Sequence, residues 1–193
     1  MKQQTRTYSW GDPQEMHKAG QALSGLEFMR LLAREELGRT PMLATLNYRF
    51  VTVDEGHVEL VCEPGEFMYN PMGVIHGGVA ATLLDTAASC AIHTMLPAGT
   101  GSTTLDLSVH LLRPLTHDLG PLRAIGDVIN KGRRTALGKS EIRDGNDRLL
   151  AHATAACMLF PPNPESLASE ELKGDSFAAR AGTPAHEPEP RSR

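Results

Sequence analysis

The residues best suited to chemistry form one short run: the segment NPMGVIHGG at positions 70–78, with Asp85 seven residues further on. Gly77 and Gly78 carry no side chain that would shield their backbone amides, so a substrate carbonyl can approach N–H groups at the start of a helix. The positive end of the helix dipole adds to this attraction. The run therefore predicts a helix N-terminus that stabilises an oxyanion without a cation.

Asp85 is the one acidic residue in an apolar, alanine-rich run that extends from Val79 to Leu96. A lone aspartate on a helix is usually a solvated surface residue, but the absence of other acidic or basic neighbours favours a functional role here. The residues on the same face are small, so a ligand can lie beside the carboxylate; they are Ala81, Thr82, Ala88 and Ser89. We interpret Asp85 as a general base or nucleophile.

The candidate oxyanion site and the candidate carboxylate lie far apart along the predicted helix. Gly77 and Asp85 are eight residues apart, which is about 12 Å along a helix at 1.5 Å per residue. One small reacting group cannot touch both within a single chain. Two antiparallel copies of the helix, related by a two-fold axis, would bring Asp85 of one chain beside Gly77 of the other, and the alanines would permit close helix contact.

The elements that must hold these residues follow from hydrophobic periodicity. We predict a helix over 25–37 and a long buried helix over 76–96, joined to the preceding strand by a loop over 66–75. Short connections between the remaining segments favour an antiparallel meander. The strands are predicted at 45–53, 57–62, 103–112, 119–130, 133–143 and 148–160. The sequence predicts an α+β fold in which a curved antiparallel sheet of about six strands wraps around one long central helix.

The ends of the chain differ from its centre. Of the 193 residues, we expect 1–22 to be a flexible N-terminal arm, 23–160 the folded domain and 161–193 a disordered tail, because the tail is rich in Pro, Glu, Ala, Ser and Arg. The N-terminus lacks the apolar core of a secretory signal, and no apolar run is long enough to span a bilayer. We therefore expect a cytoplasmic protein without membrane contact.

Charge and cysteine content narrow the partners further. A net charge of −4 argues against a nucleic-acid partner. The three cysteines and the scattered histidines lack metal-ligand spacing, so no metal is predicted. No glycine-rich phosphate loop follows a strand, so we expect no cofactor of the dinucleotide type.

The motif at 70–85 resembles the loop and central helix of hotdog-fold thioesterases, specifically the phenylacetate-pathway (PaaI-like) group. The resemblance covers about residues 23–160 and includes the Thr103-Thr104 pair, the Arg113-Pro114 pair and the turn at 132–133. It implies hydrolysis of an acyl-CoA thioester by a homodimer or, more often in this family, a homotetramer. One departure is Leu111-Leu112, where many relatives place a tyrosine before the Arg-Pro pair.

The resemblance also implies roles for individual residues. Asp85 would be the nucleophile or general base, and the Gly77 amide the oxyanion donor, with His76 shaping the turn. Asn70 would orient the water or the carbonyl. Ser89 and Thr104 would place hydroxyls near the water, although packing alone also explains both.

The phosphates of CoA need cations, and arginine suits them by its fork geometry. The candidates for substrate contact are Gly78, Arg113, Lys131, Arg133 and Arg134, although the last three could equally form a solvated turn. Two other functions stay open on the same fold. One is a non-catalytic acyl-CoA-binding protein, and the other is an acyl-thioester hydratase or dehydratase.

Overall fold

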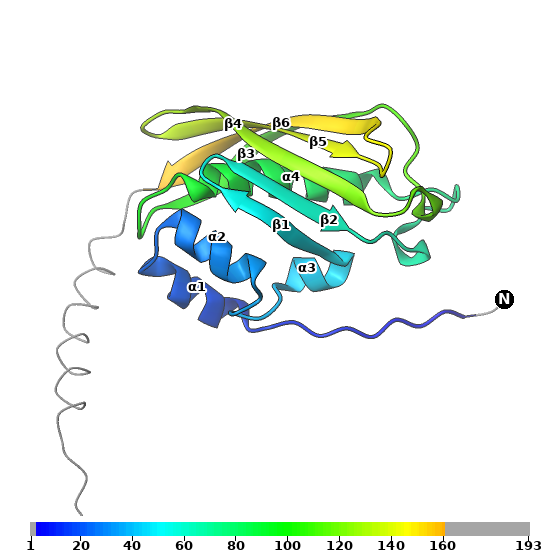
Figure 1. Ribbon diagram of the computed structural model, residues 1–193, viewed down its shortest axis with the longest axis horizontal. Helices are drawn as coiled ribbons and strands as arrows, with labels where there is room; N and C mark the ends of the chain where they lie inside the picture. Colours follow the sequence, from blue (N-terminus) through cyan, green and yellow to red (C-terminus); the bar gives the residue numbers. More distant parts are fainter. Residues whose placement is uncertain (1–2, 161–193) are drawn as a thin grey trace, which may run out of the picture. The chain divides into compact units, whose positions relative to one another are not determined.

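One antiparallel sheet and one long helix dominate the computed structural model, which describes residues 3–160 (Figure 1). The sheet has six strands in the order β1-β2-β4-β5-β6-β3, and every neighbouring pair is antiparallel. The strands are β1 Tyr48–Asp54, β2 His57–Cys62, β3 Gly101–Leu111, β4 Leu122–Lys131, β5 Thr135–Arg143 and β6 Leu149–Phe160. β1 and β3 are therefore the two edges of the sheet.

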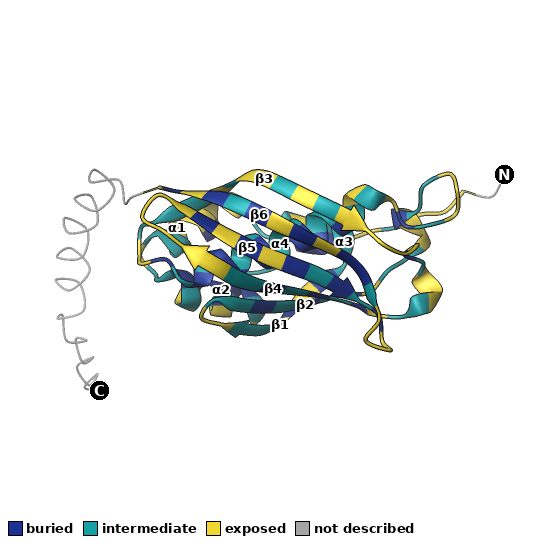
Figure 2. Ribbon diagram, turned by 90° about the horizontal axis from the view of Figure 1, so that it is seen from above, coloured by how far each residue is buried: buried dark blue, intermediate teal, exposed yellow. Residues whose placement is uncertain are grey.

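Alternation of side chains gives the sheet a buried and an exposed face. Along β5, exposed and buried residues alternate strictly from Thr135 to Ser140, and the same banding continues along β6 (Figure 2). The period of two matches the pleat of a β-strand, whose successive side chains point to opposite faces. The buried face carries the apolar residues that contact the central helix.

Helix α4, Gly77–Thr94, lies against the concave face of the sheet (Figure 1). Its contact with β4 is so close that a Cβ atom on Gly126 would lie 2.1 Å from the carbonyl oxygen of Ala87. Only glycine fits where one backbone approaches another in this way. Four helical alanines are at most 1% exposed on this side; they are Ala80, Ala87, Ala88 and Ala91.

Three shorter helices precede the sheet: α1 Pro13–Gln21, α2 Gly25–Ala33 and α3 Pro41–Leu46. Two 3-10 turns, η1 Glu66–Met68 and η2 His117–Leu119, lie in the loops. A full capping box starts α2: the Ser24 side chain accepts from the Glu27 amide, and the Glu27 carboxylate accepts from Ser24. α2 packs against α4 and β1, so the central helix is covered by the sheet on one side and by α2 on another.

The predicted order of one helix, two strands, a long helix and four strands is confirmed. The strand predicted at 119–130 begins only at Leu122, after the turn η2, and the larger differences lie before β1. The expected arm over 1–22 contains α1, which begins at Pro13 after the Asp12 cap. The predicted helix over 25–37 ends at Ala33. The strand predicted from residue 45 begins at Tyr48, because Pro41 does not end a helix but starts α3 at its first position, where proline needs no N–H partner.

The predicted tail at 161–193 lies outside the described residues. Within residues 3–160, no helix combines the length and apolarity needed to cross a bilayer.

Candidate active site

Asp85 lies at the middle of α4 on the side of the helix that the sheet leaves uncovered. Its side chain is half-buried, and the Thr104 hydroxyl donates a hydrogen bond to Asp85 Oδ1 at 2.9 Å. The hydroxyl comes from β3, the edge strand, and its oxygen is also 3.9 Å from the sulfur of Cys157. A side chain fixed by a second element has a defined orientation, which a catalytic carboxylate requires.

A β-bulge in β3 directs Thr104 toward the helix. Thr104 pairs with Cys157 and Asp106 with Ala156, so Leu105 is an extra residue with no partner in β6. Leu105 and Asp106 are both exposed, and the inward alternation resumes at Leu107. A regular strand in phase with Leu107 would turn Thr104 to the outer face, whereas a bulge resets the phase of the alternation.

The charge of Asp85 acts on two neighbouring titratable side chains, Tyr48 and Cys90. Burial raises the pKa of the Tyr48 phenol above its usual value. A hydrogen bond with the Thr86 hydroxyl lowers this pKa, and the negative charge of Asp85 raises it. Burial and the same negative charge raise the pKa of the Cys90 thiol to about 12. Both groups are therefore neutral at physiological pH. In the part of the chain that the structure describes, no lysine, arginine or histidine forms an ion pair with Asp85.

The N-terminus of α4 leaves one amide open. His76 is the N-cap, and its ring nitrogen Nδ1 accepts from the Gly78 amide at 2.9 Å, while its carbonyl oxygen accepts from Val79. Within residues 3–160, the Gly77 amide has no hydrogen-bond partner. An added Cβ at Gly77 would lie 3.0 Å from Leu111 Cδ1. The open donor therefore lies in a narrow space that glycine keeps accessible.

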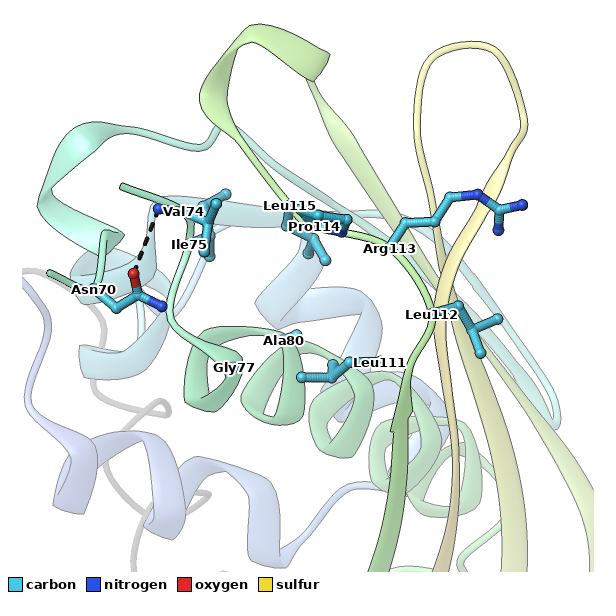
Figure 3. Close-up of a pocket in the computed structure, with 10 residues that line it drawn as sticks. All are labelled: Asn70, Val74, Ile75, Gly77, Ala80, Leu111, Leu112, Arg113, Pro114 and Leu115. Atoms are coloured by element: carbon cyan, nitrogen blue, oxygen red, sulfur yellow. Dashed lines mark hydrogen bonds between the residues drawn. The ribbon is translucent and has the colours of Figure 1, made fainter. Parts of the chain in front are cut away.

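That space is a cavity of about 360 Å³ in front of the helix (Figure 3). Asn70 lines this cavity. Its Oδ1 accepts from the backbone amides of Met72 and Val74 and thereby stabilises the turn that follows Asn70, while its side-chain amide nitrogen points away from these two amides (Figure 3). The opposite wall consists of Leu111, Leu112 and Arg113. The Leu-Leu pair that departs from the family pattern thus lies in the same cavity as Gly77.

The predicted site residues form three groups. Asp85, Thr104 and Ser89, which lies one turn beyond Asp85, surround the middle of α4; Gly77, Asn70 and Arg113 surround its N-terminus. The third group is the exposed β4–β5 turn with Lys131, Arg133 and Arg134, none of which forms an ion pair in the described part of the chain. In residues 3–160, no cluster of three or more His, Cys, Asp or Glu side chains has the arrangement of a metal site.

Comparison with known proteins agrees with this geometry. Residues 72–151, which include both Gly77 and Asp85, match the Thioesterase superfamily. The chain carries a thioesterase superfamily domain. The predicted hotdog architecture, a six-stranded antiparallel sheet with a long central helix, is confirmed, and the prediction of a thioester hydrolase is confirmed at the level of the family.

Several relatives of this thioesterase domain are known. A Saccharolobus solfataricus protein named as a candidate esterase is 28% identical over 138 residues, 72% of this chain and 87% of its own length. The 1,4-dihydroxy-2-naphthoyl-CoA hydrolase of Listeria monocytogenes is 26% identical over 106 residues, 55% of this chain and 85% of its own length. In structure, a phenylacetic acid degradation-related protein from Ralstonia eutropha aligns with a TM-score of 0.62 at 27% identity, covering 67% of this chain and 98% of its own.

Two expectations about the thioesterase helix need correction. Ala80, Ala87 and Ala91 are at most 1% exposed within one chain, with Ala87 against Gly126 of the sheet, so these three alanines are not available for contact with a second helix. Ala88 also turns to the sheet, where its carbonyl oxygen would lie 3.2 Å from a Cβ on Gly138. The helix is not covered on all sides either. Half-buried or exposed residues form a stripe at helical spacing, namely Gly78, Thr82, Asp85 and Ser89.

The N-terminal part of the chain contributes residues near Asp85 that no sequence pattern indicated. Tyr48 of β1 lies within reach of its charge, as described above. A second cavity of about 340 Å³ lies between α2, α4 and β3, and both Ser89 and Thr104 line it. The amphipathic pattern of α2 indicated which of its faces is buried, but a local pattern does not specify which other element covers that face.

Proposed function

We propose that this thioesterase hydrolyses an acyl-CoA thioester to a free carboxylic acid and CoA, at a site shared between two subunits. The observation that carries the proposal is the Asp85 carboxylate, held by the Thr104 hydroxyl at 2.9 Å on the uncovered side of the apolar helix α4. A lone carboxylate in such a place, with a fixed orientation and no cationic partner among residues 3–160, is suited to activate a nucleophile or to act as one.

The reaction requires few groups. As a general base, Asp85 takes a proton from water while the water oxygen bonds to the thioester carbonyl carbon. The carbonyl oxygen gains negative charge, which the open Gly77 amide and the helix N-terminus stabilise. The intermediate then collapses, the C–S bond breaks, and the thiolate of CoA takes up a proton. If Asp85 is instead the nucleophile, its carboxylate oxygen bonds to the carbonyl carbon and the C–S bond breaks, which releases the thiolate of CoA to take up a proton. Water then cleaves the resulting mixed anhydride to the free acid and the Asp85 carboxylate.

Two subunits are required because Asp85 and Gly77 occupy different places in one chain. The described residues that line the cavity of Gly77 do not include Asp85. β3 is an edge strand of 11 residues with its outer ladder unpaired, and the uncovered stripe of α4 lies next to it. Pairing of two β3 edges about a two-fold axis would cover both surfaces and place Gly77 of the partner near Asp85. The proposed assembly is a homodimer at minimum and a homotetramer as the family resemblance implies.

The same symmetry accounts for the basic residues. Arg113 borders the cavity of Gly77, although its guanidinium points away from the cavity (Figure 3) and donates to the Leu149 carbonyl oxygen at 2.6 Å. The β4–β5 turn lies near the C-terminal end of α4, next to the β1–β2 hairpin. Antiparallel helices would bring the turn of one subunit toward the Gly77 end of the other. We therefore propose that Arg113 of one chain and Lys131, Arg133 and Arg134 of its partner contact the phosphates of CoA.

The first experiment is thiol release from acetyl-, hexanoyl-, phenylacetyl- and palmitoyl-CoA by the wild type and by Asp85→Asn. Turnover that falls by at least about a thousandfold in the variant supports a carboxylate-dependent thioesterase. Binding of esters without thiol release by the wild type would instead indicate a non-catalytic acyl-CoA-binding protein. An absorbance change on enoyl-CoA without thiol release would indicate a hydratase. Single-turnover hydrolysis in ¹⁸O-labelled water, followed by analysis of Asp85, separates nucleophile from general base.

A second experiment tests the shared site. Gly77→Pro removes the amide donor at a helix position that tolerates proline, and Asp85→Asn removes the carboxylate. If the sites are shared, a hybrid dimer of the two inactive variants contains one intact site, and random mixing restores about a quarter of the wild-type activity. If each chain holds its own site, mixing restores none.

A further inference from the structure

The cavity of about 340 Å³ beside Asp85 is formed by three elements that meet only in the folded chain. Helix α2 supplies Phe28, Met29 and Leu32, and α4 supplies Ser89, Cys90 and His93. The third wall is β3, with the hydroxyl residues Ser102, Thr103 and Thr104. One wall is thus apolar, and Met29 and Leu32 within it are only 2% and 8% exposed.

One end of this cavity opens at the proposed catalytic group. Thr104, which lines it, donates its hydrogen bond to Asp85. Ser89 follows Asp85 by one helical turn. A thioester carbonyl placed next to Asp85 would therefore have its acyl group at the mouth of the cavity and its carbonyl oxygen toward the Gly77 amide of the partner.

The other end is closed by the contact between α2 and α4. The Gly25 amide donates to the Leu96 carbonyl oxygen at 2.9 Å, and a Cβ on Gly25 would lie 1.7 Å from the His93 carbonyl oxygen. Phe28 packs edge-on against the His93 ring with centroids 5.9 Å apart. Burial lowers the pKa of His93, so this closed end is uncharged at neutral pH.

These contacts limit the length of the chain that the cavity can hold. His93 is eight residues beyond Asp85, about 12 Å along the helix. An extended chain advances roughly 1.2 Å per bond, because the three backbone bonds of a residue span at most about 3.6 Å. The distance from carboxylate to closed end therefore corresponds to about ten chain atoms. The volume agrees, since it falls near the lower end of the range for ligand pockets.

We propose that this cavity binds the acyl group and selects compact acyl chains, of one aromatic ring or about ten chain atoms at most, over long fatty chains. The inference rests on the proposed thioesterase function. It assigns the selection to Phe28, Met29 and Leu32 of α2, which lie before the residues 72–151 that match the superfamily. The acyl-chain range of this protein is then set by its N-terminal helix α2.

The test compares kcat/KM for straight-chain acyl-CoA esters from C2 to C16, with phenylacetyl-CoA, in the wild type and in Phe28→Ala. We expect kcat/KM to drop by at least about tenfold between C10 and C16 in the wild type, and Phe28→Ala to raise the C16-to-C6 ratio by a similar factor. Phe28→Leu, which keeps an apolar side chain, covers the case in which the alanine variant does not fold. Met42→Ala, which truncates an exposed residue of α3 outside this cavity, is the matched control and should leave the ratio unchanged.

Equilibrium binding of the same esters to Asp85→Asn separates the two proposals. Length-dependent binding without hydrolysis by the wild type would refute the thioesterase proposal but retain the acyl site. Hydrolysis of C16 as fast as C6, or an unchanged ratio in both Phe28 variants, would overturn the acyl site while the thioesterase proposal stands.

Discussion

The hydrogen bond from Thr104 to Asp85 offers the sharpest single test of the site. Replacing Thr104 by valine removes one hydroxyl and keeps the branched shape. The new methyl group would contact Cys157, whose sulfur lies 3.9 Å from the Thr104 oxygen. Asp85 keeps its place on the helix but loses the group on β3 that orients its carboxylate.

The size of the effect follows from the type of bond. A hydrogen bond to a charged group contributes about 1.5–3 kcal/mol, and about 1.4 kcal/mol corresponds to a tenfold change in rate. If the full contribution is expressed in the transition state, kcat falls by about 10- to 150-fold in Thr104→Val. The free energy of unfolding should change by about 1 kcal/mol or less, because the carboxylate is only half-buried and water can replace the hydroxyl.

Steady-state thiol release gives kcat and KM for the wild type, Thr104→Val and Thr104→Ser. The serine variant keeps the hydroxyl and should retain most of the activity, while KM should change little in either variant. A double-mutant cycle with Asp85→Asn completes the assay. Once the carboxylate is gone, Thr104→Val should cause almost no further loss, since residues that act as a unit are not additive.

Two results would refute this reasoning. If Thr104→Val retains wild-type kcat, the hydrogen bond does not position the carboxylate. If the serine variant is as inactive as the valine variant, the methyl group rather than the hydroxyl is what matters.

Three further predictions concern stability and reactivity. Gly126→Ala should lower the free energy of unfolding by at least about 3 kcal/mol in urea titration, since its Cβ would meet helix backbone at 2.1 Å, whereas Gly145→Ala, with open space around it, should be nearly neutral. Because burial lowers the pKa of His93 in the folded state, the unfolded state binds more protons below about pH 6.5. Stability should therefore fall as the pH drops through that range, and His93→Gln should reduce this slope; an unchanged slope would contradict the assignment. A disulfide-exchange reagent at pH 8 should modify the native protein slowly and the denatured protein rapidly at all three thiols, whose pKa values burial raises; they are Cys62, Cys90 and Cys157.

Local patterns were sufficient for the elements that carry a strong period or a strong turn. The β1–β2 hairpin was predicted from Asp54 and Gly56, and β2 was predicted with its observed bounds. The long helix was predicted to within two residues at each end, because a glycine pair forms its first turn and Pro97 follows it. Its open amide at Gly77 also followed from the sequence, since a glycine pair at a helix start leaves little else to cover the N–H groups.

Other features depend on tertiary contacts, which local sequence patterns do not predict. The alanines of α4 are compatible with packing against a helix or a sheet, and it is the glycines Gly126 and Gly138 on distant strands that make room for them. Pro41 is equally suited to follow one helix or to begin another. The cavity beside Asp85 depends on Gly25 meeting His93, a contact between residues 68 positions apart that no local pattern encodes.

The bulge at Leu105 has a consequence for how the site can change through insertions and deletions. Loss of Leu105 would leave a regular ladder in which Thr104 and Leu107 still face the helix, so a shortened strand keeps the hydroxyl beside Asp85. Gain of one residue at the same place would need a second bulge to keep Thr104 opposite Cys157. Without it, Thr104 either turns to the outer face or shifts by two ladder positions along β6, away from Asp85. The segment between Thr104 and Leu107 can therefore lose one residue, but cannot gain one, without disturbing the position of Thr104. A scan of point substitutions along β3 would not reveal this asymmetry, whereas a comparison of one-residue deletions and insertions would.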